Sequence, residues 1–520
     1  MSEIKTLADI TRVHARVRGD ATALTYANDG REWSYAALDA EANQVANALL
    51  AAGVGAQTRI AYLDKNTPEY FTYLFGGAKI NAVSVAVNWR LAPAEMEYIL
   101  NHSEATTLLI GEEFLPLLAD MELTHIRCTV VLGDPGQSEL LSYEQWLSGH
   151  GTDAPEVTIS AADTCYQLYT SGTTGLPKGV ELTHANFMHC LSESLAATGM
   201  NQQSVNMVCM PLFHISGSGW GVVGIYNGAR SVLLRDVDLP LILRLIPQLR
   251  VTHSIFVPAV LQFLLASPEC KGTDFSSLES ITYGASPITE AVLVEAMDTF
   301  KCEFVQAYGL TETTGAICVL TPQDHAPGGP RAHLLRSCGR PIANHALRIV
   351  DAETGASMPD GEVGEIWVQG PQNMKGYWRN DEATDESFTD DWFHTGDAGY
   401  LQDGYLFIHD RVKDMIISGG ENIYPAEIEN VLMQHPQIAD AAVIGVPSER
   451  WGETVKAIVT RLDEELDEAT VIAHCREHLA HYKCPASVDW LAQIPRNPSG
   501  KILKVELRKS YWAGKNRLVS

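Results

Sequence analysis

Two patterns of apolar and polar positions divide the chain, and the change between them falls near residue 321. From about residue 58 to about residue 308, short runs rich in β-branched and aromatic residues alternate with longer stretches of helix-like periodicity. Strands are predicted at residues 59–63, 106–110, 129–132, 165–169, 231–234 and 280–283, and helices at residues 94–101, 184–197 and 289–300. Such alternation is typical of parallel sheets covered by helices.

The most apolar long stretch, residues 70–87, is interrupted by two glycines, a lysine and an asparagine at positions 76, 77, 79 and 81. A membrane-spanning helix needs about 20 consecutive apolar residues. The interrupted stretch therefore predicts a buried helix followed by a buried strand.

Beyond residue 321, Asp-Gly pairs at 360–361 and 403–404 lie beside β-rich runs at 365–369 and 405–409. These pairs favour the tight turns of antiparallel strands. A compact final unit follows residue 410. Its predicted helices are 425–433 and 468–481, and its predicted strands are 441–446 and 454–460.

These patterns predict an α/β protein with two lobes, since 520 residues are too many for one hydrophobic core. The large lobe, residues 1–410, should combine parallel-rich sheets covered by helices with a β-rich subdomain. The small lobe, residues 411–520, should be an α+β unit.

Composition and charge narrow the function. Apolar residues make up 46% of the chain and charged residues 19%, which is typical of a globular protein. The formal net charge of −27 argues against nucleic acid as a partner and against broad adhesion to anionic membranes. The ten cysteines are scattered singly, which favours buried thiols in a reducing compartment. Because the N-terminus lacks the apolar core of a signal peptide, we expect a cytoplasmic protein without integral membrane association.

Residues 169–179 (YTSGTTGLPKG) form the most informative segment. Four small hydroxylated residues and three glycines surround Lys178. Glycines allow close backbone approach, hydroxyls add donors and the lysine supplies positive charge, so the segment predicts a cradle for a polyphosphate. It differs from a Walker loop because proline precedes Lys178 and glycine follows it. The alternative is a plain surface turn rich in glycine, serine and threonine.

This segment resembles the signature loop of the adenylate-forming superfamily, which includes acyl-CoA synthetases, firefly luciferases and the adenylation domains of peptide synthetases. Further segments resemble motifs of that family in the family's order and cover nearly the whole chain: 211–214 (PLFH), 283–287 (YGASP), 307–313 (AYGLTET), 395–397 (TGD), 410–425 (DRVKDMIISGGENIYP) and 495–503 (PRNPSGKIL). The run GGENIYP is similar to acyl- and aryl-CoA synthetases more than to peptide-synthetase domains.

The resemblance implies an ATP site with Mg²⁺. Glu312 and Thr170 would lie near the metal, and a carboxylate suits this hard cation. Thr311 would meet the α-phosphate, Tyr308 would stack on adenine, and Asp397 with an arginine would bind ribose. The full implied ATP set is Thr170, Ser171, Gly172, Thr173, Thr174, Gly175, Lys178, Gly284, Ala285, Ser286, Tyr308, Gly309, Thr311, Asp397, Arg411 and Lys501. The alternative for Glu312 is a helix-capping acid.

Two arrangements of the lobes are implied as well. Lys501 lies far from the phosphate loop in sequence, so it reaches the acid and the α-phosphate only when the small lobe closes. After the adenylate forms, the small lobe, residues 411–520, would act as a mobile unit and rotate about the hinge residue Lys413. Ser418, Gly419 and Gly420 would then help to form a tunnel for the pantetheine thiol of coenzyme A.

His214 completes the implied catalytic set of Lys501, Glu312, Thr311 and His214; the family places a histidine near the acyl carboxylate, and the alternative is a core histidine. The neighbouring Lys504 is predicted to be a solvated surface lysine. Acyl-pocket candidates are small or apolar: Ile215, Gly219, Trp220, Val257, Tyr283 and Gly315. They predict a hydrophobic monocarboxylic acid, with a medium- or long-chain fatty acid favoured and an aryl or phenylpropenoic acid as the alternative.

The predicted function is therefore an AMP-forming acid–CoA ligase. ATP would activate the acid as an acyl-adenylate with release of pyrophosphate, and the thiol of coenzyme A would take the acyl group with release of AMP. The expected cofactors are ATP, Mg²⁺ and coenzyme A. The oligomeric state stays open, with a homodimer as one candidate.

Two other functions compete with this prediction. Residues 219–224 (GWGVVG) fit a dinucleotide-binding fingerprint, and Asp236 follows the predicted strand 231–234, which would indicate an oxidoreductase. However, Pro211, Phe213 and His214 stand where the buried strand of that motif should run. The other competitor is a non-catalytic nucleotide-binding scaffold, and the joint presence of Lys501, Glu312 and Asp397 argues against it.

Overall fold

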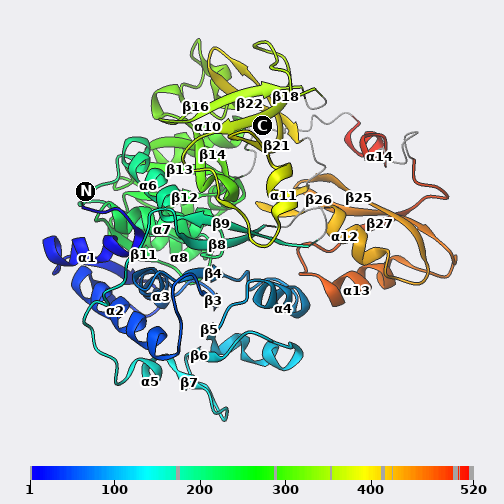
Figure 1. The fold of residues 1–520 in the computed structure, drawn as a ribbon. Helices are drawn as coiled ribbons and strands as arrows, with labels where there is room; N and C mark the ends of the chain where they lie inside the picture. Colours follow the sequence, from blue (N-terminus) through cyan, green and yellow to red (C-terminus); the bar gives the residue numbers. More distant parts are fainter. Residues whose placement is uncertain are drawn as a thin grey trace.

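The computed structural model describes residues 3–170, 176–285, 288, 290–351, 354–411, 416–423, 425–495, 502 and 504–513. It confirms the predicted fold class: parallel-rich sheets covered by helices, a β-rich subdomain and a smaller C-terminal unit (Figure 1). The division into lobes at residue 410 stays a prediction, and the terms large lobe and small lobe are used here for the described residues on either side of it.

One strand of the first sheet ends within residues 169–179, the predicted polyphosphate cradle. This sheet has eight strands in the order β19-β9-β8-β4-β3-β5-β6-β7. The strands are β3 (Arg59–Leu63), β4 (Val83–Ala86), β5 (Thr107–Gly111), β6 (Cys128–Leu132), β7 (Leu141–Ser142), β8 (Thr164–Thr170), β9 (Lys178–Thr183) and β19 (Gly376–Tyr377). Strands β3 to β8 pair in parallel, whereas β9 runs antiparallel to β8. The phosphate segment therefore joins two neighbouring antiparallel strands, which the alternating pattern did not predict.

The second sheet has nine strands in the order β16-β15-β14-β13-β12-β10-β11-β1-β2. Its members are β1 (Thr22–Tyr26), β2 (Glu32–Ser34), β10 (Val205–Val208), β11 (Arg230–Leu233), β12 (His253–Phe256), β13 (Ser280–Gly284), β14 (Glu303–Leu310), β15 (Gly315–Leu320) and β16 (Arg340–Pro341). Strand β1 pairs in parallel with β11, so the N-terminal hairpin belongs to a sheet otherwise built from residues 205–341.

Helices pack between and around these sheets. They are α1 (Leu7–Arg18), α2 (Tyr35–Ala51), α3 (Pro68–Lys79), α4 (Pro93–His102), α5 (Tyr143–Leu147), α6 (His184–Thr198), α7 (Ile215–Tyr226), α8 (Leu239–Leu249), α9 (Pro258–Ala266) and α10 (Glu290–Phe300), with 3₁₀ segments η1 (Glu112–Asp120), η2 (Pro268–Gly272), η3 (Thr311–Thr313), η4 (Pro322–Asp324) and η5 (Ala332–Arg336). Helix α6 contacts both β9 and β15, so it bridges the two sheets.

The apolar stretch at residues 70–87 forms the buried helix α3 and the buried strand β4, as predicted. Gly76 permits this burial, because a Cβ there would lie 2.8 Å from the carbonyl oxygen of Ala42 on α2. None of the helices in the described parts of the chain combines the length and hydrophobicity that a membrane span requires.

The β-rich subdomain is a five-stranded antiparallel sheet with helix α11 (Asp381–Glu386). Its strands are β17 (Ala346–Val350), β18 (Gly364–Gln369), β20 (Phe388–Thr389), β21 (Trp392–Gln402) and β22 (Tyr405–Arg411). Asp403 and Gly404 join β21 to β22 with φ values of 52° and 79°. Two successive positive φ values are the mark of a tight hairpin turn, so the predicted Asp-Gly turn is confirmed here.

The small lobe has its own sheet and core, and it lies at one side of the molecule (orange to red in Figure 1). Its strands are β23 (Ile416–Ser418), β24 (Glu421–Ile423), β25 (Ile438–Ser448), β26 (Gly452–Arg461) and β27 (Ser487–Trp490), and its helices are α12 (Pro425–Leu432), α13 (Glu468–His478) and α14 (Lys504–Trp512). Helix α13 ends three residues before the predicted end at 481. The next residues leave the helix because their backbone and side chains contact the large lobe.

Candidate active site

The two residues predicted to lie near Mg²⁺ meet at the carboxyl ends of two strands. Thr170 is the last residue of β8, and Glu312 lies in η3, directly after β14. The Thr170 hydroxyl donates a hydrogen bond of 3.3 Å to Oε1 of Glu312. Each of the two large sheets therefore contributes one oxygen-bearing side chain to the site. A hydroxyl and a carboxylate are hard oxygen ligands, so this pair fits Mg²⁺.

Two further groups surround the Glu312 carboxylate. The hydroxyl of Tyr377 donates to Oε1 of Glu312 at 3.1 Å, and the ammonium of Lys178 lies 4.7 Å from the centre of the Tyr377 ring. Burial raises the pKa of Glu312, while Tyr377, Thr170 and Lys178 oppose that rise. A carboxylate that is short of solvent and close to cationic and hydroxyl donors is suited to a divalent cation or a phosphate-bound metal.

The predicted adenine and ribose residues also touch each other. The Tyr308 hydroxyl donates a hydrogen bond of 2.8 Å to Oδ2 of Asp397, although the two residues come from β14 and β21. Asp397 is 3% exposed, and its backbone pairs with that of Arg411 on β22. The structure thus brings the ribose pair onto one hairpin beside the strand that carries Tyr308.

Close backbone approach explains two of the predicted glycines. A Cβ on Gly309 would lie 1.8 Å from the carbonyl oxygen of Gly315, and a Cβ on Gly284 would lie 2.1 Å from that of Ala307. Ala285, in contrast, holds a positive φ of 65°. The two glycines therefore let neighbouring backbones approach closely at the ends of β13 and β14, beside Thr311.

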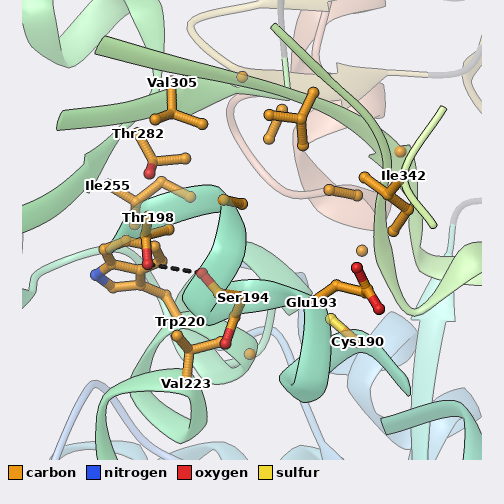
Figure 2. A pocket seen from close by; sticks show the side chains of 18 of the residues that line it. Cys190, Glu193, Ser194, Thr198, Trp220, Val223, Ile255, Thr282, Val305 and Ile342 are labelled. Carbon is orange, nitrogen blue, oxygen red and sulfur yellow. Dashed lines mark hydrogen bonds between the residues drawn. The ribbon is translucent and has the colours of Figure 1, made fainter. Parts of the chain in front are cut away.

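An apolar cavity of about 370 Å³ opens beside these strand ends. Figure 2 shows Ile255, Thr282 and Val305 reaching it from the nine-stranded sheet, and Cys190 and Glu193 from α6. The predicted residues Ile215, Gly219, Trp220, Val257 and Gly315 line it as well. Trp220 is fixed in the wall by a hydrogen bond of 3.1 Å from its ring nitrogen to the carbonyl oxygen of Met207.

Tyr283 lies outside this cavity wall. Adjacent side chains on a strand point to opposite faces, so Thr282 faces the cavity and Tyr283 faces the core behind it. The Tyr283 hydroxyl shares a hydrogen bond of 2.9 Å with Nε2 of His325. The alternation of side chains along β13 thus places Thr282, and not the predicted Tyr283, in the wall of the cavity.

The proposed dinucleotide fingerprint lies within one helix. Residues 219–224 are all part of α7, and Gly221 and Gly224 pack against Phe71 and Asn206. A dinucleotide-binding loop would instead connect a strand to the start of a helix. These glycines therefore serve helix packing and the cavity wall.

A second cavity of about 760 Å³ lies between the two lobes and shares Ile215, Val257, Ala285 and Gly309 with the first. Thr170, Thr311 and Glu312 line it from the large lobe. Ser418, Gly419 and Gly420, the predicted tunnel residues, line it from the small lobe. Gly420 lies so close to the apolar cavity that a Cβ on it would be 3.3 Å from Val257.

His214 joins the two lobes in this structure. Its Nε2 donates a hydrogen bond of 3.1 Å to Oε2 of Glu421 on β24, and Arg90 forms an ion pair with the other oxygen of the same carboxylate. Burial alone would raise the pKa of Glu421, but His214 and Arg90 outweigh it and lower the pKa to about 2. His214 is therefore a cleft residue and not a core histidine, since its side chain is 43% exposed.

Several predicted site residues lie outside the described residues: Ser171, Gly172, Thr173, Thr174, Gly175, Ser286, Lys413 and Lys501. Lys504 is described, and its predicted solvent exposure is wrong. Its ammonium lies 2.6 Å from Oε1 of Glu429, and its side chain is 11% exposed. The start of α14 is thus fastened to α12, because an ion pair holds the lysine inside the small lobe.

Sequence reasoning missed Tyr377, Arg90 and Glu421. Tyr377 reaches Glu312 from β19, far along the chain, and nothing in its local sequence indicates that contact. Arg90 and Glu421 are separated by 331 positions, and only the docking of the lobes brings them together. The glutamate did lie within the GGENIYP run, which was a usable signal.

Comparison with known proteins identifies the family. The family model described as "AMP-binding enzyme" matches residues 11–378, and the model "AMP-binding enzyme C-terminal domain" matches residues 427–501. A fatty acid–[acyl-carrier-protein] ligase, ScoC, of Streptomyces coeruleorubidus is 39% identical, covering 100% of this chain and 99% of that protein. A feruloyl-CoA synthase of an Amycolatopsis species is 36% identical, covering 96% and 97%.

A long-chain-fatty-acid–CoA ligase, FadD13, of Mycobacterium tuberculosis is 35% identical, covering 92% of this chain and 93% of that protein. The chain belongs to the AMP-binding enzymes, the adenylate-forming family that its motifs resemble. It is an acyl-CoA synthetase of the AMP-forming type. This assignment excludes the hypothesis that the protein is an oxidoreductase.

Two solved complexes of one relative, the o-succinylbenzoate CoA synthetase MenE of Bacillus subtilis, differ in their likeness to this structure. The complex of a double mutant with a product analogue, OSB-NCoA, gives a TM-score of 0.85 at 29% identity and covers 96% of this chain and 97% of that chain. The complex with the acyl-adenylate OSB-AMP gives 0.69 at 30% identity with the same coverage. The present arrangement is thus more similar to the product-analogue complex.

Proposed function

We propose that this protein joins a hydrophobic monocarboxylic acid to coenzyme A through an acyl-adenylate, with a medium- or long-chain fatty acid preferred. The observation that carries the proposal is the apolar cavity, which meets the inter-lobe cavity at Ala285 and Gly309. An acid seated there would present its carboxyl group towards the Thr170–Glu312 pair, where the α-phosphate is expected.

The polar groups of the cavity wall favour an apolar acid tail. Among its described lining residues, Arg340 is the one lysine, arginine or histidine, and its guanidinium bonds the carbonyl oxygen of Asp403 and stacks on Tyr405. The hydroxyls of Ser194 and Thr198 donate to carbonyl oxygens of their own helix. A second carboxylate on the acid would therefore meet Glu193, and the one cation of the wall, Arg340, would have to leave its bond to Asp403 to pair with it, which disfavours dicarboxylic acids.

The ATP-binding roles follow from the same geometry. Glu312 and Thr170 would hold Mg²⁺, which neutralises phosphate charge as pyrophosphate leaves. Asp397 would accept the ribose hydroxyls while Tyr308 fixes its carboxylate from one side. Thr311 and Lys178 would contact the phosphates. His214, directly before Ile215 of the shared wall, would lie next to the acyl carboxyl group.

The two half-reactions would use two positions of the small lobe. The short distance that would separate a Cβ on Gly420 from Val257, and the likeness to the product-analogue complex, support the assignment of this arrangement to thioester formation. Adenylation would need the other arrangement, with Lys501 brought to the α-phosphate by rotation about Lys413.

The decisive experiment separates the acid, the nucleotide and the acceptor. The protein is incubated with ATP, Mg²⁺, coenzyme A and single acids from short to long fatty chains, with ferulic and indoleacetic acids alongside. Mass spectrometry then follows acyl-CoA and AMP. Fatty acyl-CoA with matching AMP supports the proposal, and preferential conversion of an aromatic acid selects the aryl alternative. Adenylate and AMP without acyl-CoA refute coenzyme A as acceptor and call for the same assay with an acyl carrier protein.

We also place the protein in the cytoplasm. All ten cysteines are unpaired, and seven of them are buried, which fits a reducing compartment. A homodimer stays a prediction.

A further inference from the structure

A buried ion trio crosses the interface between the lobes. The ammonium of Lys483 lies 2.7 Å from Oε1 of Glu95 and 2.7 Å from Oε1 of Glu427. Glu95 belongs to α4 of the large lobe, whereas Glu427 and Lys483 belong to the small lobe. The three side chains are 9%, 6% and 3% exposed, respectively. The three side chains are therefore in contact and shielded from water only while the lobes are docked.

Glu95 fastens both sides of the interface through its other oxygen. Oε2 accepts hydrogen bonds of 2.9 Å from the backbone N–H of Ala92, at the start of α4, and from that of Ala480, just after α13. The side-chain amide of Asn88 adds a hydrogen bond of 3.2 Å to the hydroxyl of Tyr482. Residues 88–95 and 480–483 thus form one continuous docking seam.

The docked position of the small lobe also holds the tunnel loop, residues 418–421, beside the candidate active site. Arg90 lies within the seam and pairs with Glu421, and the adjoining Gly420 faces Val257 of the acid cavity. A shift of the seam would move Gly419, Gly420 and Glu421 away from the strand ends. The position of this loop therefore depends on the contacts of the ion trio that hold the seam together.

We propose that Lys483 is a positioning residue for thioester formation, which holds the small lobe in the thioester-forming arrangement by bridging Glu95 and Glu427. This inference rests on the proposed two-step function. Removal of one member of a buried ion cluster leaves an uncompensated charge, so the docked state loses far more than the undocked state, in which water solvates the groups. Adenylation, which requires a different lobe position, does not use the bridge.

Because of the charges in the trio, the docking of the two lobes should depend on pH. Two carboxylates face one ammonium, and burial, with a further contribution from Glu95 against the pull of Lys483, raises the pKa of Glu427 to about 7. Burial also raises the pKa values of the adjoining Tyr482 and Cys484, so both stay neutral near pH 7. Docking therefore takes up a proton between the ordinary glutamate pKa of 4.5 and about 7, and it weakens as pH rises through that range.

The test compares the two half-reactions in Lys483→Ala and Glu95→Gln variants. Adenylation is measured as acid-dependent ATP–pyrophosphate exchange, and thioester formation as the single-turnover transfer of acyl from supplied acyl-adenylate to coenzyme A. Lys483→Ala should slow the transfer about 100-fold or more, with the exchange within about threefold of the unmodified protein. Lys79→Ala is the matched control, because Lys79 is buried and pairs with Asp39 inside the large lobe at 2.7 Å. The control should leave the ratio of the two rates unchanged.

Glu95→Gln supplies the readout that a merely structural role would not move. With one carboxylate left for one ammonium, docking needs less proton uptake. The transfer rate of the unmodified protein divided by that of Glu95→Gln should therefore fall as pH rises from about 5 to about 7 and then level off. The ratio cancels the ionisation of the coenzyme A thiol. A flat ratio, or equal slowing of both half-reactions in Lys483→Ala, overturns the inference.

Hydrogen exchange provides a test that needs no substrate. Peptides covering residues 88–102 and 479–490 should exchange faster in Lys483→Ala, while those covering β25 and β26 stay protected. Unchanged exchange at the seam contradicts the bridging role. Failure of the unmodified protein to make any adenylate would refute the proposed function instead, and the exchange result would still stand on its own.

Discussion

Replacement of Gly219 by leucine should shorten the acids that the enzyme accepts. Gly219 lies on α7 and lines the apolar cavity proposed to hold the acid, and a Cβ there would meet nothing nearer than Ile215 at 3.4 Å. The other glycines of α7 have no such room: a Cβ on Gly217 would lie 2.1 Å from the carbonyl oxygen of Pro211, and one on Gly221 would lie 2.5 Å from the ring of Phe71. A leucine at 219 should thus enter the cavity without moving the helix.

The magnitude follows from the volume that the leucine takes. Its four side-chain carbons displace about four methylenes of the acid, at about 0.8 kcal/mol each, so a cavity-filling acid should lose about 3 kcal/mol, or about 200-fold in kcat/KM. Short acids that end before position 219 should keep their kcat/KM. Stability should not fall, because leucine in a helix interior is favoured over glycine by up to about 1 kcal/mol.

The assay is pyrophosphate exchange over straight-chain acids from butanoic to hexadecanoic, with thermal unfolding run in parallel. Gly219→Ala serves as the graded control and should cost about fourfold for the longest acids, as expected for one methylene. If Gly219→Leu lowers kcat/KM equally for all chain lengths, or leaves long acids untouched, the acid does not lie along α7 and the assignment of the cavity is refuted.

Further predictions concern the ATP site and the lobes. Glu312→Gln should lower acyl-adenylate formation by about 10²–10³-fold, the usual loss when one charge-stabilising group is removed, while circular dichroism shows an unchanged fold. Asp397→Asn should raise the KM for ATP by about 10- to 100-fold, because it weakens a charged acceptor of ribose hydroxyls, and steady-state kinetics would detect this. Lys501→Ala should abolish adenylate formation yet retain transfer from supplied adenylate to coenzyme A; equal loss of both steps would refute two lobe positions. Because His214 and Arg90 hold the pKa of Glu421 at about 2, its contribution to docking should be constant above the ordinary value of 4.5 and be lost as pH falls towards 2, as hydrogen exchange of residues 416–423 at graded acidic pH would show.

Local patterns predicted most of the fold, and the motif segments supplied residues that the structure brings together in the candidate ATP site. Helix and strand periodicities located α4, α6, β3, β5 and β6 within a few residues, because each is amphipathic or uniformly buried in its own right. The apolar stretch at residues 70–87 predicted the order of α3 and β4 without separate bounds. The motif segments also contained Thr170, Glu312, Tyr308 and Asp397, which the fold brings into direct contact in pairs.

What the sequence could not supply was the partner of each local element. The direction of β9 depends on its pairing with β8 and not on its own residues. The choice between Thr282 and Tyr283 for the cavity depends on which face of β13 is turned to the cavity, since both residues fit a strand. The contact of Glu95 with Lys483 spans 388 positions and exists because two lobes dock.

The parallel pairing of β1 with β11 has a consequence for how this chain is made. Residues 22–26 leave the ribosome about 200 residues before their partner, residues 230–233, has been synthesised. At about 5–20 residues per second, β1 and β2 wait roughly 10–40 s as a two-stranded hairpin, a unit that is marginally stable on its own. During that time the apolar face of β1 has no sheet to join, so nascent chains of this enzyme should depend on holding factors until the nine-stranded sheet can close around its N-terminal strand.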